Sequence, residues 1–220
     1  MNAGKCRGVL SDKVREFIEH NKTTLDECNI DNIICTCDNE PCAATSTTIQ
    51  KITFFPLKRY NNAQDVWGPC VWKLIHMVAN KLPTYFPTLL NTLPIWLPCE
   101  ECRKNSVDEI SKVREEAGVP SEHAFKLHNL VNERLKKTVY KEAPRLPHFT
   151  EDFRKKVMQS FECQVRFLGN IEDVLTPLSE TTISGEDWLL LQICRVFVEM
   201  LLDKLSLFTF GASSRSLPIL

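Results

Sequence analysis

Glycine and net charge are both scarce in this chain. Only 7 of its 220 residues are glycine, against 12 prolines, which favours helices joined by short loops. The formal net charge is −1, so no electrostatic footprint indicates nucleic acid or an anionic membrane as a partner. Residues 1–20 lack the apolar core of a signal peptide, so ordinary secretion is not expected. The composition, 43% hydrophobic and 25% charged, is that of a globular protein.

Long uninterrupted apolar runs are also missing. The most apolar segment covers residues 186–206, and Arg195, Glu199 and Asp203 interrupt it at the spacing of helical turns. Charges that interrupt an apolar segment at this spacing make a membrane-spanning helix costly. We therefore expect a packed or dimerising helix here and no membrane span.

Apolar residues recur at helical spacing along most of the chain and predict an all-α fold. The expected helices cover residues 8–30, 64–82, a short segment from about 87, then 99–118, 121–135, 150–169 and 186–206. Ser11 or Asp12 is expected to cap the helix over residues 8–30. Ser121 is expected to cap the helix over residues 121–135. Pro69 is expected in a first turn, and Pro94 is expected to break the short helix. Residues 43–50 are small and polar and indicate a linker.

Cysteine, in contrast, is abundant. Ten cysteines are many for a typical cytosolic protein and few for a small disulfide-stapled scaffold, so a redox protein or a zinc protein fits best. Four of them lie close together in the sequence: Cys28, Cys35, Cys37 and Cys42. Their spacing is poor for a zinc knuckle, whereas a Cys-x-Cys disulfide closes a strained, easily exchanged ring. A zinc site, a mobile dithiol and free thiols all remain open.

A second cysteine motif follows Pro98. Cys99 and Cys102 are three residues apart at the expected start of a helix, where the helix dipole favours a thiolate. Glu100 and Glu101 oppose this effect through their charge. The spacing suits either a redox-active disulfide or half of a zinc site and does not choose between them.

Polar and aromatic residues share faces on the helices either side of this motif. Trp72 and His76 are four residues apart, which places them on one face, although each alone is typical of a helix core. A later helix has a polar edge followed by lysines: His128, Asn129, Asn132, Lys136 and Lys137. Such an edge indicates a ligand with many acceptors, and the lysines suit phosphate or the helix C-terminus.

Three blocks around these residues resemble the FAD-linked Erv/ALR sulfhydryl oxidases, in the family's order, from about residue 58 to 140. The block close to W-x-x-L-H-x-x-A-x-x-Y-P contains Trp72, Ile75, His76, Ala79, Leu82 and Pro83. The block close to Y-P-C-x-x-C contains Pro98, Cys99 and Cys102. The block close to H-N-x-V-N-x-x-L-x-K contains His128, Asn129, Val131, Asn132, Leu135 and Lys137.

The resemblance implies a four-helix bundle with a short extra helix that holds FAD, followed by further C-terminal helices. It implies that Cys99 receives the substrate thiolate, that Cys102 faces the flavin, and that electrons pass to O2 to give H2O2. The implied FAD contacts are Trp72, His76, Cys102, His128, Asn129, Asn132 and Lys137. The implied partners are protein dithiols, O2 and a second copy of the chain, whose shuttle cysteines can serve this subunit. Cys35 with Cys37 is the first candidate shuttle pair, and Cys37 with Cys42 the second.

Several features depart from the family pattern. Leucines replace the tyrosines at Leu82 and Leu97, and the family's structural cysteine pair is missing, with Cys163 and Cys194 as a possible replacement far downstream. Cys70 is extra and is interpreted as a small buried hydrophobe. The expected segments are a cysteine-rich region (1–55), the FAD-binding bundle (56–142) and a C-terminal extension (143–220). The resemblance implies the mitochondrial intermembrane space or, for a divergent viral member, host cytoplasm or the virion. The alternatives are a zinc-binding module and a catalytically inactive helical scaffold.

Overall fold

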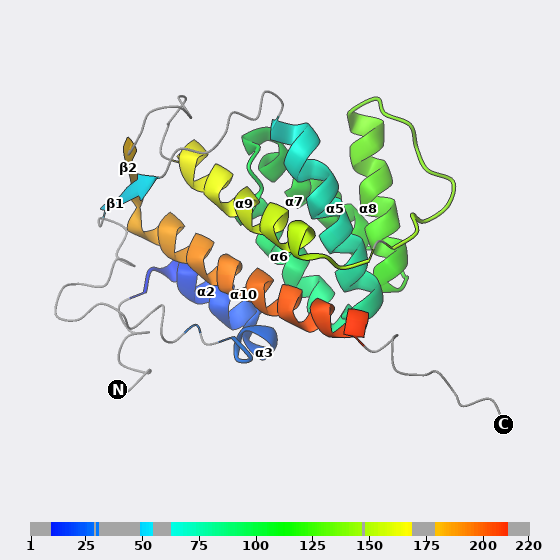
Figure 1. Ribbon diagram of the computed structural model, residues 1–220, viewed down its shortest axis with the longest axis horizontal. Helices are drawn as coiled ribbons and strands as arrows, with labels where there is room; N and C mark the ends of the chain where they lie inside the picture. Colours follow the sequence, from blue (N-terminus) through cyan, green and yellow to red (C-terminus); the bar gives the residue numbers. More distant parts are fainter. Residues whose placement is uncertain are drawn as a thin grey trace.

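The computed structural model describes residues 10–28, 30, 49–54, 63–146, 148–168 and 179–210. Helices make up most of this part of the chain, which confirms the predicted all-α fold class (Figure 1). The described residues also contain one pair of short β-strands, which the sequence did not predict.

Four helices form the bundle. They are α5 (Ala63–Lys81), α6 (Phe86–Trp96), α7 (Glu100–Arg114) and α8 (Pro120–Arg134), with a 3-10 turn, η2 (Pro83–Tyr85), before α6. Helix α5 contacts α6 and α8, and α7 contacts the same two helices, so the four close into a ring. Each helix therefore contributes one face to a shared interior.

A second layer covers α5 and α6. Helices α9 (Glu151–Leu168) and α10 (Gly185–Phe210) pack on these two helices and on each other, and α2 (Asp12–His20) lies along α10 (Figure 1). A short helix, α3 (Lys22–Leu25), follows α2. The C-terminal helix is thus packed, as its interrupting charges predicted. In the part of the chain that is described, no helix combines the length and the apolar character needed to cross a membrane.

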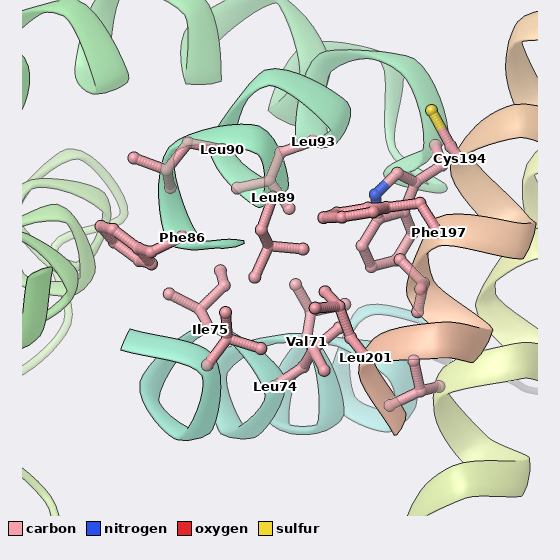
Figure 2. Packing of buried hydrophobic residues seen from close by; sticks show 14 of the residues in the cluster. Val71, Leu74, Ile75, Phe86, Leu89, Leu90, Leu93, Cys194, Phe197 and Leu201 are labelled. Carbon is pink, nitrogen blue, oxygen red and sulfur yellow. The ribbon is translucent and has the colours of Figure 1, made fainter. Parts of the chain in front are cut away.

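The hydrophobic core lies where α10 meets α5 and α6. Figure 2 shows Leu74 of α5, Leu89 of α6 and Phe197 of α10 among the side chains gathered there. All three are fully buried. The same cluster extends from Leu10 to Leu205, so residues before and after the four-helix bundle contribute to the core that supports it. The division of the chain into segments 1–55, 56–142 and 143–220 stays a prediction.

The strands pair residues that are distant in the sequence. Strand β1 (Ile49–Phe54) runs antiparallel to β2 (Ser179–Ser184), with Ile49 opposite Ser184 and Phe54 opposite Ser179. The sequence predicted no strand, and β1 begins within the expected linker 43–50. Two-stranded pairs depend on a partner and on surrounding contacts rather than on local preference, so a single segment does not reveal them.

The prediction of one continuous helix over residues 8–30 was wrong. Ser11 caps α2 as predicted, with its hydroxyl accepting from the Val14 amide, but the helix ends at His20, with Asn21 as its C-cap. There the Asn21 side chain donates to the Phe17 carbonyl at 2.8 Å, which competes with continued helical hydrogen bonding. The chain then resumes as α3.

Three further local predictions were wrong. Ser121 is not a cap: α8 begins at Pro120, and the Glu122 carboxylate accepts from the Val119 amide at 3.1 Å. Pro69 lies in the second turn of α5 instead of the first. Pro94 does not break α6, which continues to Trp96, where the fully buried indole donates to the Thr92 hydroxyl at 2.9 Å. Tertiary packing of Trp96 offsets the hydrogen bond that Pro94 cannot make.

Candidate functional site

The two cysteines of the second motif form a disulfide at the N-terminus of α7. Cys99 is the N-cap residue, and its sulfur accepts a hydrogen bond from the Cys102 amide at 3.2 Å. The preceding turn is fixed by Arg103, whose guanidinium donates to the Leu97 carbonyl at 2.8 Å. The disulfide is therefore presented at a rigid point, next to the positive end of the helix dipole.

A cavity of about 470 Å³ lies beside this disulfide. Its walls come from α5, α6, α7, α8 and the loop after α8, and its volume is within the range of small-molecule and cofactor sites. Cys102 lines the cavity and Cys99 does not. Six of the predicted cofactor residues line it: Trp72, His76, Cys102, His128, Asn132 and Lys137.

An aromatic cluster forms one wall. The Trp72 and His128 rings stack with centroids 4.0 Å apart and planes within 7°. His128 Nδ1 lies 3.0 Å from His76 Nε2, so one nitrogen donates and the other accepts. The Tyr140 ring meets His128 edge-on at 5.3 Å. Residues from α5, α8 and the following loop thus meet in one rigid group.

Both histidines are held neutral by their surroundings. Burial, and then the neighbouring His76 and Lys137, lower the pKa of His128 to about 4, and burial lowers the pKa of His76. Uncharged rings are suited to stacking on a flat ligand and to hydrogen bonding at fixed nitrogens. They are less suited to binding anions.

The lowered pKa of His128 predicts a pH dependence of stability. The folded state leaves His128 unprotonated between about pH 4 and 6.5, whereas the unfolded chain binds a proton there. The free energy of unfolding should therefore fall as the pH drops through this window. His128→Gln, which retains a polar partner for His76, should reduce the loss of melting temperature between pH 7 and 4.5. The exposed His20→Gln should not, and an equal effect of the two changes would contradict the prediction.

Asn132 carries the clearest sign of a missing partner. The residue is 6% exposed and lines the cavity, yet its side-chain Nδ2 has no hydrogen-bond partner within the described chain. A buried donor without a partner costs free energy, so a natural protein rarely leaves one unexplained. A ligand acceptor in the cavity would supply the missing bond.

Charged residues that the sequence did not indicate also line the cavity. The mostly buried Glu109 carboxylate pairs with Arg134 Nε at 2.7 Å. Glu109 follows Cys102 by seven residues and Ser106 by three, so helical spacing from the cysteine could have identified this face of α7. Arg145 and Tyr140 lie in a loop without periodicity, and no sequence signal pointed to them.

Asn129 is not brought to the cavity, unlike the other predicted cofactor residues. Its side-chain Nδ2 donates to the Tyr140 carbonyl and its Oδ1 accepts from the Tyr140 amide, both at 3.0 Å. The structure therefore gives this amide a partner in the loop after α8.

Most of the other cysteines fall into two groups. Cys6, Cys35, Cys37 and Cys42, the last three of which supply both candidate shuttle pairs, lie outside the described residues. Three described cysteines are free and buried: Cys28, Cys70 and Cys194. Burial raises the pKa of Cys28 to about 11 and raises the pKa of the other two, which disfavours thiolate chemistry.

Two of the buried thiols, Cys70 and Cys194, were the subject of predictions from the sequence. Cys70 is a buried free thiol, as predicted, and Cys194 is free, so its suggested pairing with Cys163 was wrong.

Among the described side chains, no group of three or more His, Cys, Asp or Glu is placed to hold a metal ion. The N-terminal cysteines required by the zinc hypothesis lie mostly outside that part of the chain.

The chain was compared with known proteins at three levels. No protein-family model, curated protein or solved structure matches it.

Proposed function

We propose that this protein is an FAD-dependent thiol oxidase that converts protein dithiols to disulfides and passes the electrons to O2. One observation carries the proposal: Cys102, half of a disulfide at a helix N-terminus, lines the same cavity as an aromatic cluster and an unsatisfied buried amide. A disulfide beside a cofactor-sized cavity is the arrangement that dithiol-to-cofactor electron transfer needs.

The residues around the cavity fit a flavin nucleotide. Apolar side chains such as Leu127 and Val131 suit a flat ring system, and the Trp72–His128 stack offers an aromatic surface. Asn132 Nδ2 offers a donor to a ring acceptor, and Lys137 offers a charge to a phosphate. When bound, FAD would supply a two-electron acceptor that can be reoxidised by O2 with release of H2O2.

The disulfide chemistry follows from the positions of the two sulfurs. A substrate thiolate attacks Cys99 Sγ, the Cys99–Cys102 bond breaks, and Cys102 leaves as a thiolate inside the cavity. The second substrate thiol, after losing its proton, attacks the substrate sulfur of the mixed disulfide. Its attack releases Cys99 and the oxidised substrate, so the substrate loses two electrons and two protons.

The local structure favours release of Cys99 from the mixed disulfide. The Cys102 amide donates to Cys99 Sγ, and the α7 dipole stabilises negative charge at the same sulfur. Cys99 is therefore a good leaving group when the mixed disulfide resolves. Cys102, which lines the cavity, is the sulfur from which the two electrons are passed on.

Flavin content and oxygen consumption test the proposal. The purified full chain should be yellow, with flavin absorbance near ~450 nm, and should consume O2 and form H2O2 with dithiothreitol. A folded, colourless protein that does not take up FAD would contradict it. Stoichiometric zinc that is lost on Cys99→Ser would favour the zinc-binding alternative, and bound FAD without O2 consumption would favour the inactive scaffold.

Replacing Asn132 by leucine separates ligand binding from folding. Because Asn132 Nδ2 has no described partner, Asn132→Leu should leave the melting temperature of the flavin-free protein unchanged or raised. The affinity for FAD should fall, because the ligand loses a donor. Isothermal titration and thermal melts measure the two effects. A destabilised protein with unchanged FAD affinity would show that Asn132 serves the fold and not the ligand.

A further inference from the structure

We propose that the loop from Leu135 to Leu146, called here the strap, forms a phosphate-binding wall of the cavity. Arg145 joins Lys137 in holding the phosphates of a flavin nucleotide, and Asn129 is the residue that positions the strap. This inference rests on the proposed flavin-dependent function. It adds a ligand preference: the site selects phosphorylated flavins over riboflavin.

The strap is attached to α8 at two points. At its start, the Lys137 amide donates to the Asn132 carbonyl at 2.8 Å, and Lys136 has a φ of 54°, the left-handed conformation that reverses the chain after a helix. Further along, Asn129 bonds both the amide and the carbonyl of Tyr140 at 3.0 Å. These contacts set the path of the strap beside the cavity.

The Tyr140 clamp also links the strap to the aromatic cluster. The Tyr140 ring contacts His128 edge-on at 5.3 Å, so the strap backbone and the stacked rings are fixed relative to each other. The strap residues that line the cavity are Leu135, Lys137, Tyr140, Pro144 and Arg145. A mobile surface loop would not be expected to have both backbone groups of one residue bonded by a helix side chain.

The cavity has an excess of positive charge. Its basic lining residues are Lys73, Arg134, Lys137 and Arg145, and its one acidic lining residue, Glu109, is paired with Arg134 at 2.7 Å. Among the described residues, no carboxylate forms an ion pair with Lys137 or Arg145. The neutral histidines do not add to the charge. Lys137 and Arg145 therefore line a cavity whose acidic side chain, Glu109, is already paired with Arg134.

Positive charge next to an apolar, aromatic cavity matches the two parts of a flavin nucleotide. The ring requires an apolar surface, and the phosphates require cations with hydrogen-bond donors. An arginine can bind a phosphate with two parallel hydrogen bonds, which lysine cannot do. Riboflavin has the flavin ring but no phosphates, so its affinity measures binding of the ring alone.

Flavin titrations of the full chain test the inference. With FAD, FMN and riboflavin as probes, followed by flavin fluorescence, Arg145→Gln and Lys137→Gln should each weaken FAD binding about tenfold. Riboflavin binding should be unchanged. The salt dependence of FAD binding should become shallower in both variants, because a charge contact is lost. Lys141→Gln is the matched control, since Lys141 is an exposed strap lysine that does not line the cavity.

Asn129→Ala tests the positioning role. It should weaken FAD binding and not riboflavin binding, and it should speed hydrogen exchange at the Tyr140 amide. Asn129→Asp, which keeps the acceptor for that amide, should restore part of the FAD affinity. A purely structural role for Asn129 would lower the affinity for both flavins equally.

Two outcomes overturn the inference in distinguishable ways. If Arg145→Gln binds FAD as tightly as the unaltered chain, or loses riboflavin affinity to the same extent, the strap is not a phosphate site, while the proposed oxidase function stands. If the unaltered chain binds neither FAD nor riboflavin, the proposed function and the strap inference fail together.

Discussion

Replacing Cys102 by serine is expected to reduce dithiothreitol-dependent oxygen consumption to background while the folded protein still binds FAD. Cys102 is the disulfide sulfur that lines the cavity, so in the proposed mechanism its removal breaks the path from substrate to cofactor. The hydroxyl of serine cannot form the disulfide that substrate reduces. Activity is measured with an oxygen electrode, and bound flavin by absorbance after gel filtration.

Cys70→Ala is the matched control for this change. Cys70 is also on the bundle, but it is a buried free thiol that does not line the cavity. Its removal should leave turnover unchanged at the cost of a modest loss of stability. The Cys102→Ser variant should also expose Cys99 as a reactive thiol, because its sulfur lies at the N-terminus of α7. Retained turnover in Cys102→Ser would remove the basis of the proposed mechanism.

Phe197→Ala is expected to cost about 3–5 kcal/mol of the free energy of unfolding. Phe197 lies on α10, is fully buried, and packs where α10 meets α5 and α6 (Figure 2). Since small domains have total stabilities of about 5–15 kcal/mol, this loss is a large fraction of the total. Urea denaturation followed by circular dichroism measures it, provided that the slope with denaturant is unchanged.

Phe208→Ala on the same helix provides the comparison. Phe208 is 50% exposed, so its removal should change the free energy of unfolding by about 0.5 kcal/mol or less. Similar, small effects of both changes would mean that α10 is not part of the core that supports the bundle. A large difference would mean that the C-terminal extension cannot be removed without destabilising the cavity.

Helical spacing was enough to place most of the candidate site. Trp72 with His76, and His128 with Asn132, are pairs one turn apart, and regular helices keep such pairs on one face. The Pro98 boundary similarly located Cys99 at a helix start. These features depend on residues within a turn or two of each other, so the sequence alone predicts them.

Asn129, which the family resemblance implies as a cofactor contact, does not line the cavity. Neighbouring positions on α8 look equivalent in a helical pattern, but only the tertiary structure shows which of them meets the strap. The missed strand pair β1–β2 has a similar cause, because its register depends on residues far apart in the sequence.

The sequence by itself determined the all-α class, most of the helices, and the two-cysteine motif at the start of α7. These follow from local hydrogen bonding and from periodic burial of apolar side chains. The tertiary structure decided that Cys102 and not Cys99 lines the cavity, that Asn132 Nδ2 lacks a partner, and that α10 completes the core. The physical reason is that cavities, unsatisfied donors and core contacts arise where separate helices meet, and the geometry of that meeting is set by packing across the whole chain.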